Sequence, residues 1–121
     1  MGEQWQVGIG GAAMAAAPAT PSAGQDPVEV DPKHYGVEFE DERVRVLRVR
    51  YGPHEKSKLH WHPPAVVVIL SDCDFRFYSM GRQQNILGSK GQIICYEEAV
   101  EHAPENLSDE PFEAIMIEIK R

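Results

Sequence analysis

The sequence has few cysteines, and their spacing excludes one common kind of metal site. Only Cys73 and Cys95 occur among the 121 residues, and this pair does not fit a zinc ribbon. Two interpretations of the pair remain open. The cysteines form one disulfide if the protein is exported, or they are two buried thiols if it stays in the cytosol.

Long apolar runs and clustered positive charge are also absent. No stretch approaches the length of a transmembrane helix, so we expect no membrane partner. The net charge is −7 at pH 7, which argues against a nucleic-acid partner, because phosphate binding requires a clustered basic surface. The arginines of residues 43–50 alternate with Val and Leu, as the polar face of a strand does, and this pattern favours a strand over an anion site.

Lysine and arginine are missing before Lys33. The small apolar residues of this segment resemble the end of a secretory signal and its cleavage region, yet the positive start of such a signal is absent. The alternative is a disordered tail. We expect a flexible or signal-like segment at residues 1–30 and a single domain at residues 31–121. The location is then the cytoplasm, or the periplasm or exterior if the segment is a signal remnant.

From Asp31 onward the pattern is one of short strands separated by turn signals, without an amphipathic helix of three turns. The apolar alternation in "RVRVLRVRY" changes phase near Val46, which predicts a bulge or bend there. "AVVVIL" predicts a strand buried on both faces or nearly so, and "SMGRQQ" a hairpin loop around Gly81. Six to eight such strands favour an all-β sandwich or barrel.

Two histidines stand immediately before the most apolar run of the chain, in "KLHWHPPAVVVIL". Side chains alternate between the faces of a strand, so Lys58, His60 and His62 share one face while Leu59 and Trp61 take the other. Two imidazoles that point the same way suit a metal site, and a solvated strand face can also carry them by chance.

A third histidine, His102 in "EHAPEN", lies far along the chain from this pair. Metal sites are often assembled from a local pair and one distant residue, because the fold brings them together. Three imidazoles leave coordination positions open for water, substrate or dioxygen.

Two motifs around these histidines resemble those of the cupin superfamily. The first runs from Gly52 through "HEKSKLHWHPPAVVV", and the second is "GQIICYEEAVEHAPEN", in which His102 and Asn106 hold the positions of an H-x-x-x-N pattern. The resemblance covers roughly residues 37–119. It implies a cupin-type double-stranded β-helix, or jelly-roll barrel, in which Asn106 ties the loop after His102.

The resemblance implies a divalent transition metal, Fe, Zn, Ni, Mn or Cu, held by His60, His62 and His102. Cupins with a full ligand set carry a Glu soon after the histidine pair, where this sequence has Val66 and Val67. A three-histidine set resembles that of thiol dioxygenases in the superfamily.

Other residues near the motifs do not complete this set. The second motif has Glu97 and Ala99 where Pro and Gly are usual. Glu101 reaches the site only if its strand is twisted, and we expect His34 and His54 to be loop residues that bind no metal.

These features support a small cupin of unknown specific activity that binds the metal inside its barrel. Three neutral imidazoles leave the charge of a divalent ion uncompensated, which favours a small anionic substrate in dioxygenase-like or isomerase-like chemistry. No residue stands out as a general base. The alternative is a non-catalytic small-molecule binding or sensing cupin with a vestigial or absent metal site. The resemblance also makes a homodimer plausible, because exposed β edges need covering.

Overall fold

The computed structural model describes residues 25–120, which form one short helix and nine strands. In chain order these are α2 (Pro27–Val30), β1 (Tyr35–Glu40), β2 (Val44–Tyr51), β3 (His60–His62), β4 (Ala65–Ile69), β5 (Cys73–Ser79), β6 (Arg82–Gly88), β7 (Ile93–Tyr96), β8 (Val100–Asn106) and β9 (Phe112–Ile119).

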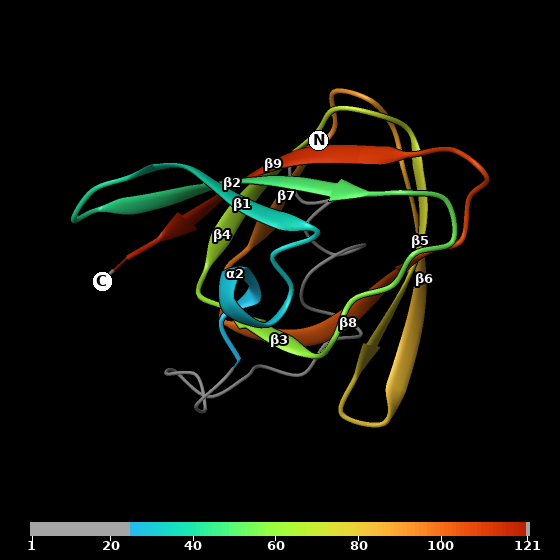
Figure 1. The fold of residues 1–121 in the computed structure, drawn as a ribbon, viewed down its shortest axis with the longest axis horizontal. Helices are drawn as coiled ribbons and strands as arrows, with labels where there is room; N and C mark the ends of the chain where they lie inside the picture. Colours follow the sequence, from blue (N-terminus) through green and yellow to red (C-terminus); the bar gives the residue numbers. More distant parts are fainter. Residues whose placement is uncertain (1–24, 121) are drawn as a thin grey trace.

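The strands form two antiparallel sheets that face each other (Figure 1). The five-stranded sheet has the order β1-β2-β9-β4-β7, and the four-stranded sheet has the order β3-β8-β5-β6. Neighbours such as β2 and β9 lie far apart in the sequence, as in a jelly roll. The all-β prediction, a double-stranded β-helix, is confirmed.

The core lies between the sheets because alternate side chains of each strand point inward. In β9 the residues Phe112, Ala114, Met116 and Glu118 are buried, and the residues between them are half-buried. In β2 the buried residues likewise alternate, and they are Leu47, Val49 and Tyr51. Their burial, about 25 cal/mol per Å² of apolar surface, is the main term that holds the sheets together.

The irregularity predicted near Val46 is present, but the extra residue belongs to the partner strand β1 and not to β2. β2 pairs with β9 in unbroken register from Val44 to Tyr51. The register shift instead lies on the neighbouring strand β1, between Val37 and Phe39. A bulge gives one strand an extra residue and leaves its partner regular. Arg45 therefore stays on the inward face of β2.

The hairpin predicted around Gly81 is confirmed. Ser79 pairs with Arg82 across a two-residue turn, and both turn residues, Met80 and Gly81, have positive φ angles of 50° and 77°. Two residues with positive φ are the mark of the tight turn that matches the twist of a β-hairpin. This turn fixes the register of β5 with β6.

The helix α2 lies within the segment 1–30 of the sequence and packs against β1 and β3. The Asp26 carboxylate caps it by accepting a 2.9 Å hydrogen bond from the Val28 backbone N–H, and Pro27 is buried. The rest of the tail prediction, residues 1–24, lies outside the described residues. In the described part of the chain, no helix is long and apolar enough to cross a membrane.

Both cysteines are free thiols in this structure. Cys73 lies in β5 and Cys95 in β7, which belong to different sheets. Burial raises the pKa of the Cys73 thiol to about 11, so this thiol is protonated at neutral pH and is a weak nucleophile.

Candidate metal centre

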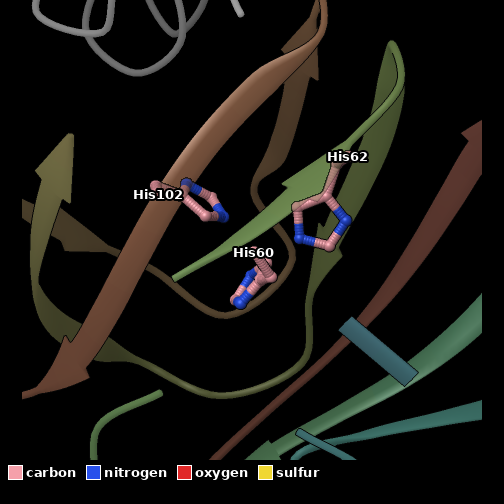
Figure 2. Close-up of side chains that lie close together, drawn as sticks. All are labelled: His60, His62 and His102. Atoms are coloured by element: carbon pink, nitrogen blue, oxygen red, sulfur yellow. The ribbon is translucent and has the colours of Figure 1, made fainter. Parts of the chain in front are cut away.

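The three histidines named by the sequence come together in the barrel interior, on strands β3 and β8. These strands pair antiparallel, with His60 directly opposite His102 and His62 opposite Val100. The exposed fractions of the side chains are 0% for His60 and His62 and 2% for His102. Figure 2 shows the three rings turned toward one common volume.

One ring nitrogen from each histidine lies within 4.8 Å of the corresponding nitrogens of the other two. The Nε2 atoms of His60, His62 and His102 are buried and have no hydrogen-bond partner among the described residues. A buried polar atom without a partner costs free energy, so native proteins rarely keep three side by side. Unshared nitrogens that converge in this way fit a transition metal.

Hydrogen bonds at the other ring nitrogen fix the tautomer of two of these imidazoles. The Nδ1 atom of His60 donates to the backbone carbonyl of Lys58 at 2.9 Å, and that of His62 donates to the Glu118 carboxylate at 2.7 Å. Because carbonyl and carboxylate oxygens only accept, both Nδ1 atoms carry the proton. The Nε2 lone pairs therefore face the cluster.

Burial keeps two of the three imidazoles, His60 and His102, uncharged. Burial lowers the pKa of His60 well below its usual value, and the neighbouring His62 adds to the effect. Burial also lowers the pKa of His102 well below its usual value, and the nearby His60 and His62 lower it further. Neutral imidazole is the form that binds a metal, so these two rings are in the binding form at neutral pH.

The carboxylate that cupins place after the histidine pair is absent from the cluster. Val67, one of the two replacements, lines the cavity beside His102, whereas Val66 is half-buried on the opposite side of β4. Glu101 alternates with the inward His102 along β8, and its carboxylate accepts a hydrogen bond from the Gln25 side chain. Glu101 is thus directed away from the cluster.

His34 and His54 lie outside the cluster. His54 is exposed and contacts Asp109 at 2.6 Å. His34 is a buried member of a different network, with Nδ1 2.7 Å from Asp31 and Nε2 3.0 Å from Glu55. Both of its nitrogens are occupied, so it has no free lone pair for a metal.

An ionic network behind His62 was not found from the sequence. Glu118 is 2% exposed and joins His62 to Arg45, which in turn binds Asp26 through both terminal nitrogens at 3.0 and 3.1 Å. Burial alone would lower the pKa of Arg45, but its hydrogen bond to Asp26 and the charge of Glu118 outweigh burial and raise it. The sequence feature that indicates Glu118 is the alternation of β9, which places this residue on the same face as Phe112, Ala114 and Met116.

A small apolar cavity of about 60 Å³ reaches the cluster at His102. Aliphatic side chains and six aromatic rings line it, from Tyr35, Tyr51, Phe75, Phe77, Tyr96 and Phe112. Among the described residues that line the cavity there is no Lys, Arg, Asp or Glu. Burial raises the pKa of the Tyr96 phenol, so this wall group stays protonated.

Asn106 is fully buried and ties two loops together, in agreement with the structural role predicted for it. Its side-chain amide donates to the carbonyl oxygens of Gly52 and Glu110 at 3.1 and 2.9 Å, and its side-chain oxygen accepts from the Ser108 backbone N–H. These bonds anchor the end of β8, the strand that carries His102.

Comparisons with solved structures agree with this fold. A cupin domain from Bordetella pertussis Tohama I has 28% sequence identity and a TM-score of 0.68, over 72% of this chain and 92% of that one. A predicted oxalate decarboxylase from Thermotoga maritima has 16% identity and a TM-score of 0.55, over 89% of this chain and 98% of that one. At the latter identity the likeness is one of fold alone.

A protein with a double-stranded β-helix domain from Klebsiella pneumoniae is similar at 19% identity and a TM-score of 0.57, over 82% of this chain and 80% of that one. The search of curated proteins found no match. A family model described as a cupin domain matches residues 47–118, which is more than half of the chain and includes all three histidines. The chain therefore belongs to the cupin domain family.

Proposed function

We propose that this cupin binds one divalent transition metal through His60, His62 and His102 and acts on a small anionic molecule inside its barrel. The observation that carries the proposal is the convergence of three buried imidazoles, each with a ring nitrogen that has no hydrogen-bond partner among the described residues. Of the expected ions, Fe, Zn, Ni and Cu are well suited to imidazole donors, whereas Mn prefers oxygen ligands. When bound, such an ion supplies Lewis-acid polarisation of a substrate oxygen or a position for dioxygen.

The cavity supports a particular kind of substrate. Its lining residues are almost entirely apolar, and none among the described ones is a cation. A second carboxylate on a ligand would therefore be desolvated without a partner, which costs several kcal/mol. We infer a compact ligand with one anionic donor group directed at the three histidines and an apolar remainder among the rings.

The protein's own residues bind and shield such a ligand. Phe77 stacks on the His102 ring with centroids 5.2 Å apart, and Tyr35 packs edge-on against His60 at 4.8 Å. These rings limit the rotation of the imidazoles and exclude water from the cluster. Exclusion of water strengthens every electrostatic interaction within the site, since the local dielectric constant falls.

The first experiment is metal content per chain, measured by elemental mass spectrometry on protein purified without a histidine tag. We expect about one equivalent in the wild type and almost none in His60→Ala. The matched control is His54→Ala, which removes an exposed histidine outside the cluster and should keep the metal. A wild type that contains no metal and takes up no added Fe, Zn, Ni, Mn or Cu would refute the proposal.

A second candidate function, binding or sensing without turnover, is favoured by one feature of the cavity. Apart from His102, its titratable lining groups are the tyrosines Tyr35, Tyr51 and Tyr96, and burial raises the pKa of each. Such phenols are poor general bases at neutral pH. Thermal stabilisation by small carboxylic acids and enols, unchanged by a chelator, would favour this function, because any ligand of the native state raises its stability.

A further inference from the structure

Glu118 connects the two sheets of the barrel at the histidine cluster. It belongs to β9, in the middle of the five-stranded sheet, and lies opposite Ala65 of β4 and Arg45 of β2. Its side chain crosses the interior to His62, which belongs to the other sheet. A carboxylate that is 2% exposed requires paired partners, because an isolated buried charge costs several kcal/mol.

Both carboxylate oxygens of Glu118 have a defined partner. One oxygen, Oε1, accepts from the Arg45 Nε at 2.8 Å, and the other, Oε2, accepts from the His62 Nδ1 at 2.7 Å. Asp26 holds the far side of the guanidinium through two further bonds. Arg45 can only donate hydrogen bonds, so the side-chain atom of residue 118 that faces Arg45 must be an acceptor.

The three histidines differ in what holds their second nitrogen. His60 has the Lys58 backbone carbonyl and the Ser57 hydroxyl, and the His102 Nδ1 has no partner among the described residues. His62 alone has a carboxylate within hydrogen-bond distance. An anionic acceptor on the far side of an imidazole fixes its tautomer and makes Nε2 more electron-rich.

We propose that Glu118 is the positioning residue of the centre, and that its carboxylate, oriented by Arg45, presents the Nε2 lone pair of His62 to the metal. It supplies from behind His62 the negative charge that this chain lacks at Val66 and Val67. The inference rests on the proposed function, because it concerns the affinity of the same three-histidine site.

The substitution Glu118→Gln tests this with almost no change of shape. Because Arg45 only donates, the amide oxygen of the substituted side chain must face Arg45, and its NH₂ group must face His62. That NH₂ group donates to Nδ1, so the ring proton moves to Nε2 and the lone pair leaves the cluster. An amide in place of a tautomer-fixing carboxylate has this effect in other histidine-dependent sites.

Two measurements follow on wild type, Glu118→Gln and the control Glu113→Gln. Glu113 lies in the same strand but pairs with Arg48 and Arg50 instead of the cluster. Long-range ¹H–¹⁵N correlation spectra of the metal-free proteins give the His62 tautomer, which a purely structural role would leave unchanged. Competition with a chelator gives the Zn²⁺ dissociation constant.

We expect the Nδ1–H tautomer in the wild type and in Glu113→Gln, and Nε2–H in Glu118→Gln, with Zn²⁺ bound about 10- to 100-fold more weakly in the latter. An unchanged tautomer in Glu118→Gln, or a dissociation constant within about twofold of the wild type, would overturn the proposal. If the wild type itself bound no Zn²⁺ or other ion, the proposed function would fail instead. If Glu118→Gln did not fold, the tautomer of His62 in the wild type would decide, because an Nε2–H form there would overturn the proposal.

Discussion

His60 and His102 lie directly opposite each other on two antiparallel strands, with ring centroids 5.0 Å apart. The centre is therefore set by the register of β3 with β8. A slip of β3 by one residue would turn His60 to the outer face while His102 stayed inside, since side chains alternate along a strand. Asn106 and the isolated bridge between Lys56 and Glu105 secure the same pair of segments.

Metal binding should stabilise the fold through these rings. For wild type at a free Zn²⁺ concentration 100 times the dissociation constant, mass action adds about 2.7 kcal/mol to the free energy of unfolding. His102→Ala removes one of three ligands, so its melting temperature should not rise with Zn²⁺. The measurement is thermal unfolding with and without the ion.

The control for this experiment is His54→Ala, which should gain as much stability from Zn²⁺ as the wild type does. Equal gains in His102→Ala and wild type would place the bound ion somewhere other than the cluster. Wild type and His54→Ala should both lose this gain in stability when excess chelator is added.

The histidine cluster was predictable because a local pair and a second motif further along the chain pointed to the same kind of site. A spacing of two residues places His60 and His62 on one face of any strand, and the motif that contains His102 lies in a second strand. Glu118 was not assigned, although its strand was expected. The buried face of β9 carries Phe112, Ala114, Met116 and Glu118, and its other face carries Glu113 and three isoleucines. Each face therefore has apolar residues and one carboxylate. Only the tertiary packing decides which carboxylate is inside.

His34 illustrates a second limit of prediction from sequence. Its neighbours in the chain resemble a loop, yet it is 4% exposed and stacks on Tyr51 with ring centroids 4.1 Å apart. Its partner Glu55 comes from the segment after β2, which local pattern cannot place beside it. A contact between two loops, such as that of His34 with Glu55, depends on how the chain folds back on itself. Alternation within one strand carries no information about such contacts.

Glu55 should make stability depend on pH in the acid range. Lys33, the Gly52 backbone N–H and His34 lower the pKa of Glu55 to about 2. A depressed carboxyl pKa stabilises the folded state above the unfolded value near 4.5, and this contribution is lost as the pH falls toward 2. The difference in unfolding free energy between wild type and Glu55→Gln should thus be largest above about pH 5 and shrink below about pH 4.5. Denaturant unfolding at several pH values measures it, and a difference that stays constant with pH would contradict the expectation.

Asn106 should contribute to stability through its buried hydrogen bonds. Asn106→Ala leaves the carbonyl oxygens of Gly52 and Glu110 and the N–H of Ser108 without a side-chain partner. We expect a loss of about 2 kcal/mol in the free energy of unfolding, since unsatisfied buried groups cost about 1–3 kcal/mol. Urea unfolding gives the value. Asn85→Ala, which removes an exposed contact with Arg76, is the matched control and should change stability by no more than about 0.5 kcal/mol.

Val67 is the position at which a carboxylate could be restored to the cluster. Its side chain lines the cavity together with His102, whereas Val66 lies on the other face of the same strand. Val67→Glu buries a carboxylate in an apolar cavity, so we expect the metal-free variant to be several kcal/mol less stable than wild type. A bound divalent ion offsets that cost, because the new oxygen can join the three nitrogens as a ligand.

The expected result is therefore a larger rise in melting temperature on addition of Zn²⁺ or Mn²⁺ for Val67→Glu than for wild type. Mn²⁺ is the more telling ion, since it prefers oxygen donors and a set of imidazoles alone serves it poorly. Val66→Glu is the matched control, with the same chemistry one residue away on the opposite face, and it should respond to both ions as wild type does. Equal responses from the two variants would mean that the cluster does not direct the ion to the inner face of β4.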